Sequence, residues 1–261
     1  MSATRRVPIA LELYSVREAM KEDLPATLAK VAQMGYEGVE FAGFYDYPAA
    51  ELRQILDDNG LICCGAHLGI NTLLGDELEK TAEFNYILGN PYLICPGLPG
   101  DYTGSRANWQ RTAEVFNDIS EKCRKMNCWV GYHNHHTEFT ELDGEQPWDT
   151  FFGGTVYDVI MQLDTGNALR GGSHVGHFVE RYPYRALTVH LKPYDTEAAK
   201  ENPDLGYRPV IGDDSIPWTE LFELLETIGG ARWYIVEYES DLYPPLEAVE
   251  ICLQRLKDMG K

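Results

Sequence analysis

Eight short apolar segments recur along this chain, and stretches with helical spacing alternate with them. The segments at 7–14, 38–41, 61–67, 92–95, 128–132, 156–163, 186–191 and 233–236 are predicted to be strands. Helices are predicted at 24–34, 49–59, 76–88, 108–126, 148–152, 175–182, 218–227 and 246–259. Regular alternation favours a parallel sheet, and eight such units favour a closed (β/α)8 barrel. Because 261 residues suit one such barrel and no linker interrupts them, we expect a single domain over 1–261.

A doubly wound open sheet is the competing architecture. Such a sheet normally has a glycine-rich phosphate-binding loop after its first strand. The sequence at that position is Ser15-Val16-Arg17-Glu18, which offers no glycine. The barrel is therefore the preferred fold.

The most chemically distinctive stretch is rich in histidine. It runs from Tyr132 to Phe139 and contains His133, His135, His136 and Glu138. Histidine is the commonest metal ligand and carries protons near neutral pH. The alternative is one core histidine with a satisfied hydrogen bond and two solvated neighbours, but loops on a rigid scaffold often carry functional groups.

Polar side chains lie at the ends of several predicted strands, including the strand that leads into this stretch. Active sites of these barrels lie at the carboxyl ends of the strands, so such side chains would share one mouth. They are His67, His133, His135, Glu138, Asp164, His190, Lys192, Glu237 and Glu239. Carboxylates gathered in one mouth require protons or a cation, and mixed carboxylate and imidazole ligands suit Mn, Fe, Co or Zn better than Ca. Individually each has a plainer reading: His67 could be a core histidine and Asp164 a turn residue.

Charge and cysteine content limit the partners and the compartment. The formal net charge of −19 disfavours nucleic acid and anionic membranes, and mildly disfavours a strongly anionic substrate. The six cysteines show no C-x-x-C spacing and are expected to be reduced, buried thiols. The segment 1–6 is short and polar, and Glu12 interrupts the apolar run that follows it. We therefore expect no secretory segment and a cytoplasmic location.

Taken together, these segments resemble the sugar phosphate isomerase/epimerase superfamily, the xylose-isomerase-like TIM barrels. The resemblance covers nearly the whole chain. It is carried by Gly35-Tyr36-Glu37-Gly38-Val39-Glu40, Tyr132-His133-Asn134-His135, Leu163-Asp164-Thr165-Gly166-Asn167, Val189-His190-Leu191-Lys192, Val236-Glu237 and the segment 211–218.

The resemblance implies one divalent metal ion, among Mn, Co, Zn, Fe and Mg, with Mn favoured. Asp164, His190 and Glu237 are the implied ligands from the last three strands. Epimerase members have a glutamate where this chain has His133, so the fifth-strand ligand is either His133 or a returning Glu138, and Glu138 is preferred. The expected catalytic residues are His133, His135 and Glu237. Substrate binding is expected from His67, Lys192 and Asn167.

The predicted function is a metal-dependent isomerase, epimerase or lyase for a small sugar, keto-sugar or polyol, in the branch of inosose dehydratases and keto-sugar isomerases. One alternative is elimination or hydrolysis of 3-keto-glycosides. Others are an abasic-site endonuclease, disfavoured by charge and by only seven histidines, and a metal-free glycosidase using Glu138 and Glu237. The last alternative is a non-catalytic sugar-binding subunit.

A homo-oligomer is considered as well, in which the loops 96–105 and 193–217 would form a lid or a contact between subunits.

Overall fold

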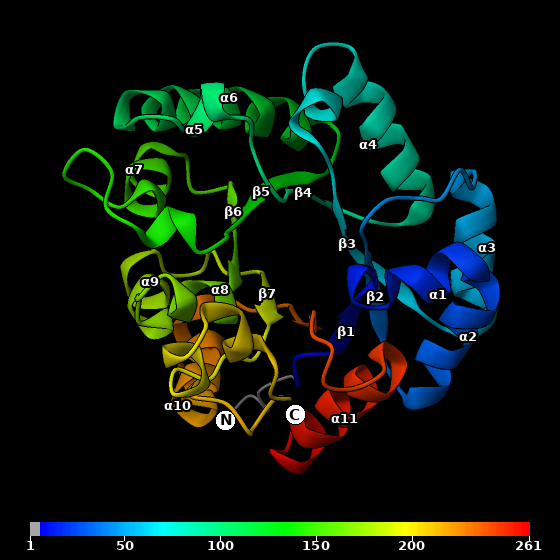
Figure 1. The fold of residues 1–261 in the computed structure, drawn as a ribbon. Coiled ribbons are helices and arrows are strands. Elements are labelled where there is room, and N and C mark those ends of the chain that lie inside the picture. Colours follow the sequence, from blue (N-terminus) through cyan, green and yellow to red (C-terminus); the bar gives the residue numbers. More distant parts are fainter. Residues whose placement is uncertain (1–5) are drawn as a thin grey trace.

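Eight parallel strands close into a barrel in the order β1 to β8, and helices surround them (Figure 1). This computed structural model describes residues 6–261, so the expectation for residues 1–6 falls almost entirely outside it. The strands are β1 (Ile9–Glu12), β2 (Gly38–Phe41), β3 (Ile62–His67), β4 (Tyr92–Cys95), β5 (Trp129–His133), β6 (Ile160–Asp164), β7 (Thr188–Leu191) and β8 (Trp233–Val236). The predicted (β/α)8 barrel is confirmed.

Strand register aligns polar side chains on neighbouring strands of the barrel. Glu12 is aligned with Glu40, and Asp164 with His190. Pairing of β1 with both β2 and β8 closes the sheet. Side chains alternate between the two faces of a strand, so polar residues within these apolar runs can point into the barrel while their neighbours pack outward.

Strand β5 illustrates this alternation. Tyr132 packs against Phe151 and Trp109, with ring centroids 5.2 and 5.7 Å away. The next residue, His133, is buried among polar side chains inside the barrel. The aromatic packing outside the barrel thus fixes the strand that carries this histidine.

The helices follow the predicted alternation closely. They are α1 (Arg17–Glu22), α2 (Leu24–Met34), α3 (Ala49–Asn59), α4 (Glu77–Leu88), α5 (Gly100–Thr103), α6 (Arg106–Lys125), α7 (Pro147–Gly154), α8 (Thr165–Arg170), α9 (Val175–Arg181), α10 (Trp218–Leu224) and α11 (Pro245–Asp258). Helix α2 ends at Gly35, whose φ of 102° suits glycine. The signals at both ends of this helix are local, which is why its predicted and observed bounds agree.

Three helices form where the sequence suggested loops, namely α1, the single-turn α5 and α8. Helix α1 follows a short turn at Leu13–Val16. Helix α8 begins directly after Asp164, whose carboxylate accepts a hydrogen bond from the backbone N–H of Asn167. The turn residues after β6 are therefore a helix N-cap, which uses the same Asp chemistry as a turn.

The predicted state of the thiols is confirmed, since all six cysteines are buried and unpaired. Within residues 6–261, no helix combines the length and the apolar character needed to cross a membrane.

Candidate active site

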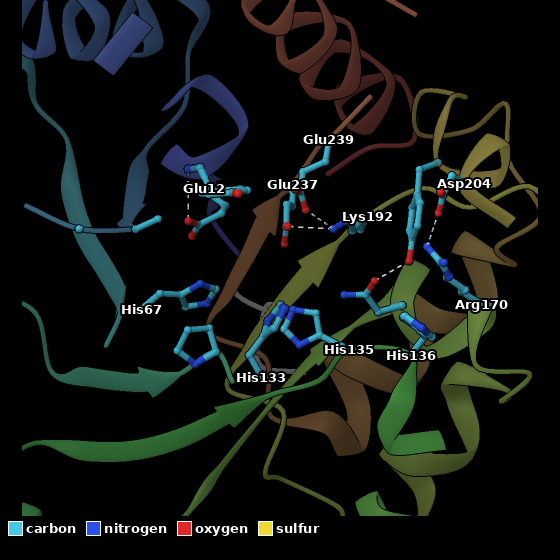
Figure 2. Close-up of a pocket in the computed structure, with 16 residues that line it drawn as sticks. Glu12, His67, His133, His135, His136, Arg170, Lys192, Asp204, Glu237 and Glu239 are labelled. Carbon is cyan, nitrogen blue, oxygen red and sulfur yellow. Dashed lines mark hydrogen bonds and ion pairs between the residues drawn. The ribbon is translucent and has the colours of Figure 1, made fainter. Parts of the chain in front are cut away.

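A cavity of about 690 Å³ opens at the carboxyl ends of the strands. Figure 2 shows its charged lining residues facing one another across this space. They come from distant parts of the chain and include Glu12, His67, His133, His135, His136, Arg170, Lys192, Asp204, Glu237 and Glu239. This volume suits a small-molecule ligand.

Two histidines that line the cavity, His67 and His133, belong to a hydrogen-bonded polar network centred on the buried Gln162. Its Oε1 accepts hydrogen bonds from Nε2 of His67 at 2.8 Å and from Nδ1 of His133 at 3.1 Å. Its amide nitrogen donates to Glu40 at 2.9 Å and to Thr188 at 3.0 Å. Because a carboxylate can only accept, this orientation of the Gln162 amide is fixed, and both imidazole nitrogens facing its oxygen carry hydrogen.

This network sets the tautomer of His133. With the hydrogen on Nδ1, the Nε2 lone pair is free, and it lies 4.0 Å from Oδ2 of Asp164. That Oδ2 is buried and has no hydrogen-bond partner, whereas Oδ1 accepts from the backbone N–H of Asn167 at 2.7 Å. Two unused electron pairs thus face one gap, as expected of ligands for a cation.

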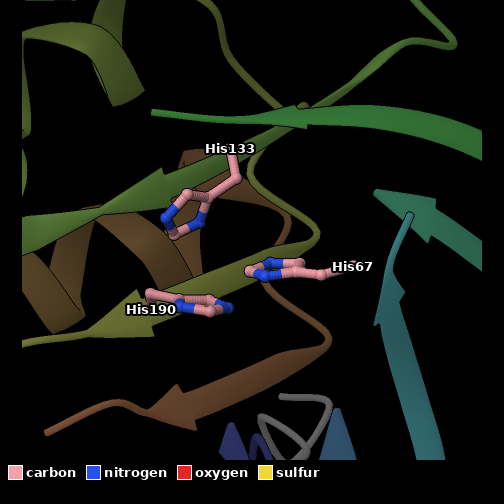
Figure 3. A group of neighbouring side chains, drawn as sticks. All are labelled: His67, His133 and His190. Carbon is pink, nitrogen blue, oxygen red and sulfur yellow. The ribbon is translucent and has the colours of Figure 1, made fainter. Parts of the chain in front are cut away.

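His190 lies beside this gap, between two carboxylates. Its Nδ1 lies 2.5 Å from Glu237 and its Nε2 lies 2.5 Å from Glu40. His67 stacks against it with ring centroids 5.3 Å apart, and His133 lies edge-on at 4.6 Å (Figure 3). One ligand atom from each of His133, Asp164, His190 and Glu237 lies within 4.8 Å of the others. This buried cluster is consistent with a metal site of mixed nitrogen and oxygen ligands.

Burial and neighbouring charges shift the pKa values of these groups strongly. Burial, together with nearby His190 and His67, holds the pKa of His133 well below its usual value, so its imidazole is neutral. Burial raises the pKa of Asp164 to about 8, against the attraction of Lys192. Burial lowers the pKa of His190, but the Glu40 and Glu237 carboxylates outweigh it and raise that pKa well above the usual value.

These shifts predict that metal binding strengthens as the pH rises. Below a pH of about 8 the metal-free protein holds a proton on Asp164, and His190 is also protonated, so a metal must displace both. Apparent affinity should therefore rise roughly tenfold per pH unit for each proton displaced. Calorimetric titration of Mn²⁺ at pH 6, 7 and 8 measures this slope. A pH-independent affinity would show that these groups are not ligands.

The structure does not bring Glu138 into this cluster. Glu138 lies in the turn Thr137–Phe139, where its Oε1 accepts from the Tyr132 hydroxyl at 2.9 Å. Its Oε2 accepts from the backbone N–H of His135 at 2.8 Å. Both oxygens serve the loop after β5, and His133 occupies the place next to Asp164 that was expected for Glu138.

The remaining predicted residues lie around the cavity. Lys192 is buried, with its ammonium 2.9 Å from Glu237 and 2.6 Å from Glu239. The Asn167 amide donates to the Asn134 carbonyl and accepts from the Tyr207 hydroxyl. His67 lies in the network described above, and His135 is exposed at the mouth.

Several residues of the site were not singled out from the sequence. Glu12, Glu40 and Gln162 are fully buried although each stands within an apolar strand, and that mismatch was the available signal. Tyr207, Asp204 and Arg170 come from the long loop after β7 and from α8. Nothing local in those segments indicates that they turn toward the cavity.

Comparison with known proteins agrees with this architecture. Residues 28–259 match the xylose isomerase-like TIM barrel family, to which the chain therefore belongs. An inosose dehydratase from Serratia proteamaculans is 25% identical over 245 residues, covering 82% of each chain. A solved sugar phosphate isomerase/epimerase from Parabacteroides distasonis has a TM-score of 0.82 at 22% identity, covering 98% of each chain. A solved L-ribulose 3-epimerase has a TM-score of 0.72 at 15% identity, covering 97% of this chain and 94% of that one.

Proposed function

We propose that this protein is a divalent-metal-dependent enzyme that isomerises, epimerises or dehydrates a small keto-sugar or polyol. The observation that carries the proposal is the ligand cluster, in which the unpartnered oxygen of Asp164 faces the free nitrogen of His133. The names of the relatives, an inosose dehydratase and sugar isomerases or epimerases, support the same range of reactions.

His133, Asp164, His190 and Glu237 are the proposed ligands, with His133 replacing Glu138. Two imidazoles and two carboxylates suit Mn, Co, Zn or Fe, and Mn remains the favoured ion, with Mg also considered. A divalent ion held by these four residues would supply a Lewis acid beside the substrate carbonyl, which would make the neighbouring C–H more acidic.

The other side chains bind substrate and move the proton. We assign proton transfer to His135, which lines the cavity at its mouth and whose backbone is held by Glu138. We assign Lys192, whose ammonium contacts Glu237 and Glu239, to a hydrogen bond with a substrate oxygen. His67 and Asn167 line the same cavity and are assigned to hydroxyl groups. The contacts of Glu237 with His190 and Lys192 favour the ligand role over proton transfer.

Removal of metal should abolish turnover. The protein is dialysed against EDTA and then assayed with inososes, ketohexoses, ketopentoses and 3-keto-glycosides, with and without Mn²⁺, Co²⁺, Zn²⁺ or Mg²⁺. We expect activity with at least one class, lost on dialysis and restored by one of the ions.

The products separate the reactions, because a dehydratase loses water while an epimerase retains the formula and exchanges one hydrogen with solvent. Turnover unaffected by EDTA would contradict the proposal. It would favour a metal-free hydrolase or another chemistry of this barrel.

A further inference from the structure

The cavity contains two side chains with a permanent positive charge, and both are already paired. Nη1 of Arg170 lies 2.8 Å from Oδ1 of Asp204. The Lys192 ammonium lies between Glu237 and Glu239, as given above. Figure 2 shows the two pairs on the same side of the cavity.

Both cations lie near the aromatic ring of Tyr207. The Arg170 guanidinium lies 5.4 Å and the Lys192 ammonium 5.1 Å from the ring centroid of Tyr207. The Tyr207 hydroxyl donates to Asn167 at 2.6 Å. The loop is packed tightly behind this ring, since a Cβ at Gly206 would lie 2.5 Å from a carbon of Tyr194. Arg170 and Lys192 therefore lie near the same ring on one wall of the cavity.

The acidic groups offset all the positive charge that the site can offer. A divalent ion, Lys192 and Arg170 together are balanced charge for charge by Asp164, Asp204, Glu237 and Glu239. Glu12 adds a further carboxyl group to the lining. The net charge of −19 adds a long-range repulsion of anions.

A phosphate or carboxylate group would thus meet no cation that lacks a carboxylate beside it, although an uncharged oxygen can still accept a hydrogen bond from Lys192. Proteins recognise such groups with unpaired arginines, lysines or backbone N–H groups. The backbone N–H of Asn167, at the start of α8, is already bonded to Asp164. An anionic substrate would have to break the buried ion pairs of Lys192 or share Arg170 with the exposed Asp204 carboxylate, which would repel it.

We propose that the substrate is an uncharged polyhydroxy ketone, without phosphate or carboxylate, and that Asp204 and Glu239 exclude anionic analogues. This inference rests on the proposed function and specifies its substrate class. It separates this chain from enzymes that act on sugar phosphates, whatever the shared fold.

The test compares D-fructose with D-fructose 6-phosphate by calorimetric titration of Mn²⁺-loaded protein. We expect the neutral ketose to bind at least about tenfold more tightly at an ionic strength of about 10 mM, and the ratio to shrink in about 300 mM salt. Equal or tighter binding of the phosphate ester would overturn the inference. Absence of binding by either ketose at millimolar concentration would overturn it as well.

Variants locate the exclusion in the cavity. Asp204→Asn and Glu239→Gln should each reduce the affinity ratio of D-fructose to D-fructose 6-phosphate several-fold, because each removes one negative charge beside Arg170 or Lys192. Glu197→Gln makes the same charge change at an exposed position paired with Lys200, and should leave the ratio unchanged. Equal effects of all three variants would mean that overall charge, and not the wall of the cavity, sets the preference.

Failure of this inference can be distinguished from failure of the proposed function. A protein that takes up no divalent metal contradicts the proposed function. Titration of that metal-free protein with each ketose still compares the two binding affinities, because the ion pairs of Arg170 and Lys192 are present without the metal.

Discussion

Asp164→Asn is expected to lower the affinity for Mn²⁺ by more than about 100-fold, because removal of a proposed direct ligand should exceed the 10–100-fold cost of losing a supporting residue. The asparagine side chain is nearly isosteric, and its oxygen can still accept the N–H of Asn167. What the variant removes is the negative charge at the unpartnered oxygen. Calorimetric titration with Mn²⁺ measures the loss, and His133→Ala should produce one of similar size.

The matched control for these variants is Glu138→Gln. Both Glu138 oxygens are occupied by Tyr132 and the loop after β5, so this variant should retain its metal. It should reduce turnover instead, because the backbone N–H of His135 loses a charged acceptor. Loss of metal in Glu138→Gln, with retention in His133→Ala, would restore the original preference for Glu138 as the fifth-strand ligand.

The free energy of unfolding of Asp164→Asn shows whether this variant loses only a metal ligand or also damages the fold. The folded-state pKa of Asp164, about 8, lies above its unfolded value of about 3.9. Its contribution to stability is therefore present at low pH and declines as the pH rises from about 4 to 8. Without metal, Asp164→Asn should match the parent at low pH and be more stable near pH 8, as urea unfolding would show. A variant destabilised at every pH would mean that the oxygen has an unrecognised structural role.

The sequence predicted helix ends and the clustering of polar residues where the residues that mark them lie close together in the chain. Asp164 and Glu237 could be recognised because each stands at the end of an apolar run, and His190 because it interrupts one; register in a parallel barrel brings such residues together. Helix bounds such as those of α2 were predictable for the same reason, since a glycine marks its end.

What the sequence could not determine was which way neighbouring side chains point. His133 and Glu138 are separated by five positions, and either could reach the mouth of the barrel until the turn at Thr137–Phe139 is known. That turn directs Glu138 toward Tyr132, and pairing with Gln162 directs the free nitrogen of His133 toward Asp164. The contribution of Tyr207 depends on a loop whose path is set by packing against Tyr194, which has no short-range signature.

Glu40 is the residue whose role follows most directly from packing, and it leads to the second large expected effect. It bonds to the nitrogen of His190 opposite the one that faces Glu237. A carboxylate in this position fixes the orientation of a metal-binding imidazole and increases its basicity. Glu40→Gln should therefore lower Mn²⁺ affinity about 10–100-fold while leaving all four proposed ligands in place.

Space for this carboxylate exists because position 65 has no side chain. A Cβ at Gly65 would lie less than 2 Å from a Glu40 oxygen, so Gly65→Ala must displace the carboxylate from His190 and Gln162. We expect a loss of about 2–4 kcal/mol in unfolding free energy from overpacking and broken hydrogen bonds. Metal affinity should fall as in Glu40→Gln. Gly69→Ala, where nothing lies within 4 Å of the added carbon, is the control and should change neither quantity.

A double-mutant cycle tests whether Gly65 acts through Glu40. In a Glu40→Ala background the obstructing carboxylate is absent, so Gly65→Ala should cost little further stability or metal affinity. The two substitutions would then be strongly non-additive. If their effects instead add, Gly65 matters for the strand itself, for example through its pairing with Glu40 across β2 and β3. The lack of a side chain at position 65 would then not be needed to make room for the Glu40 carboxylate.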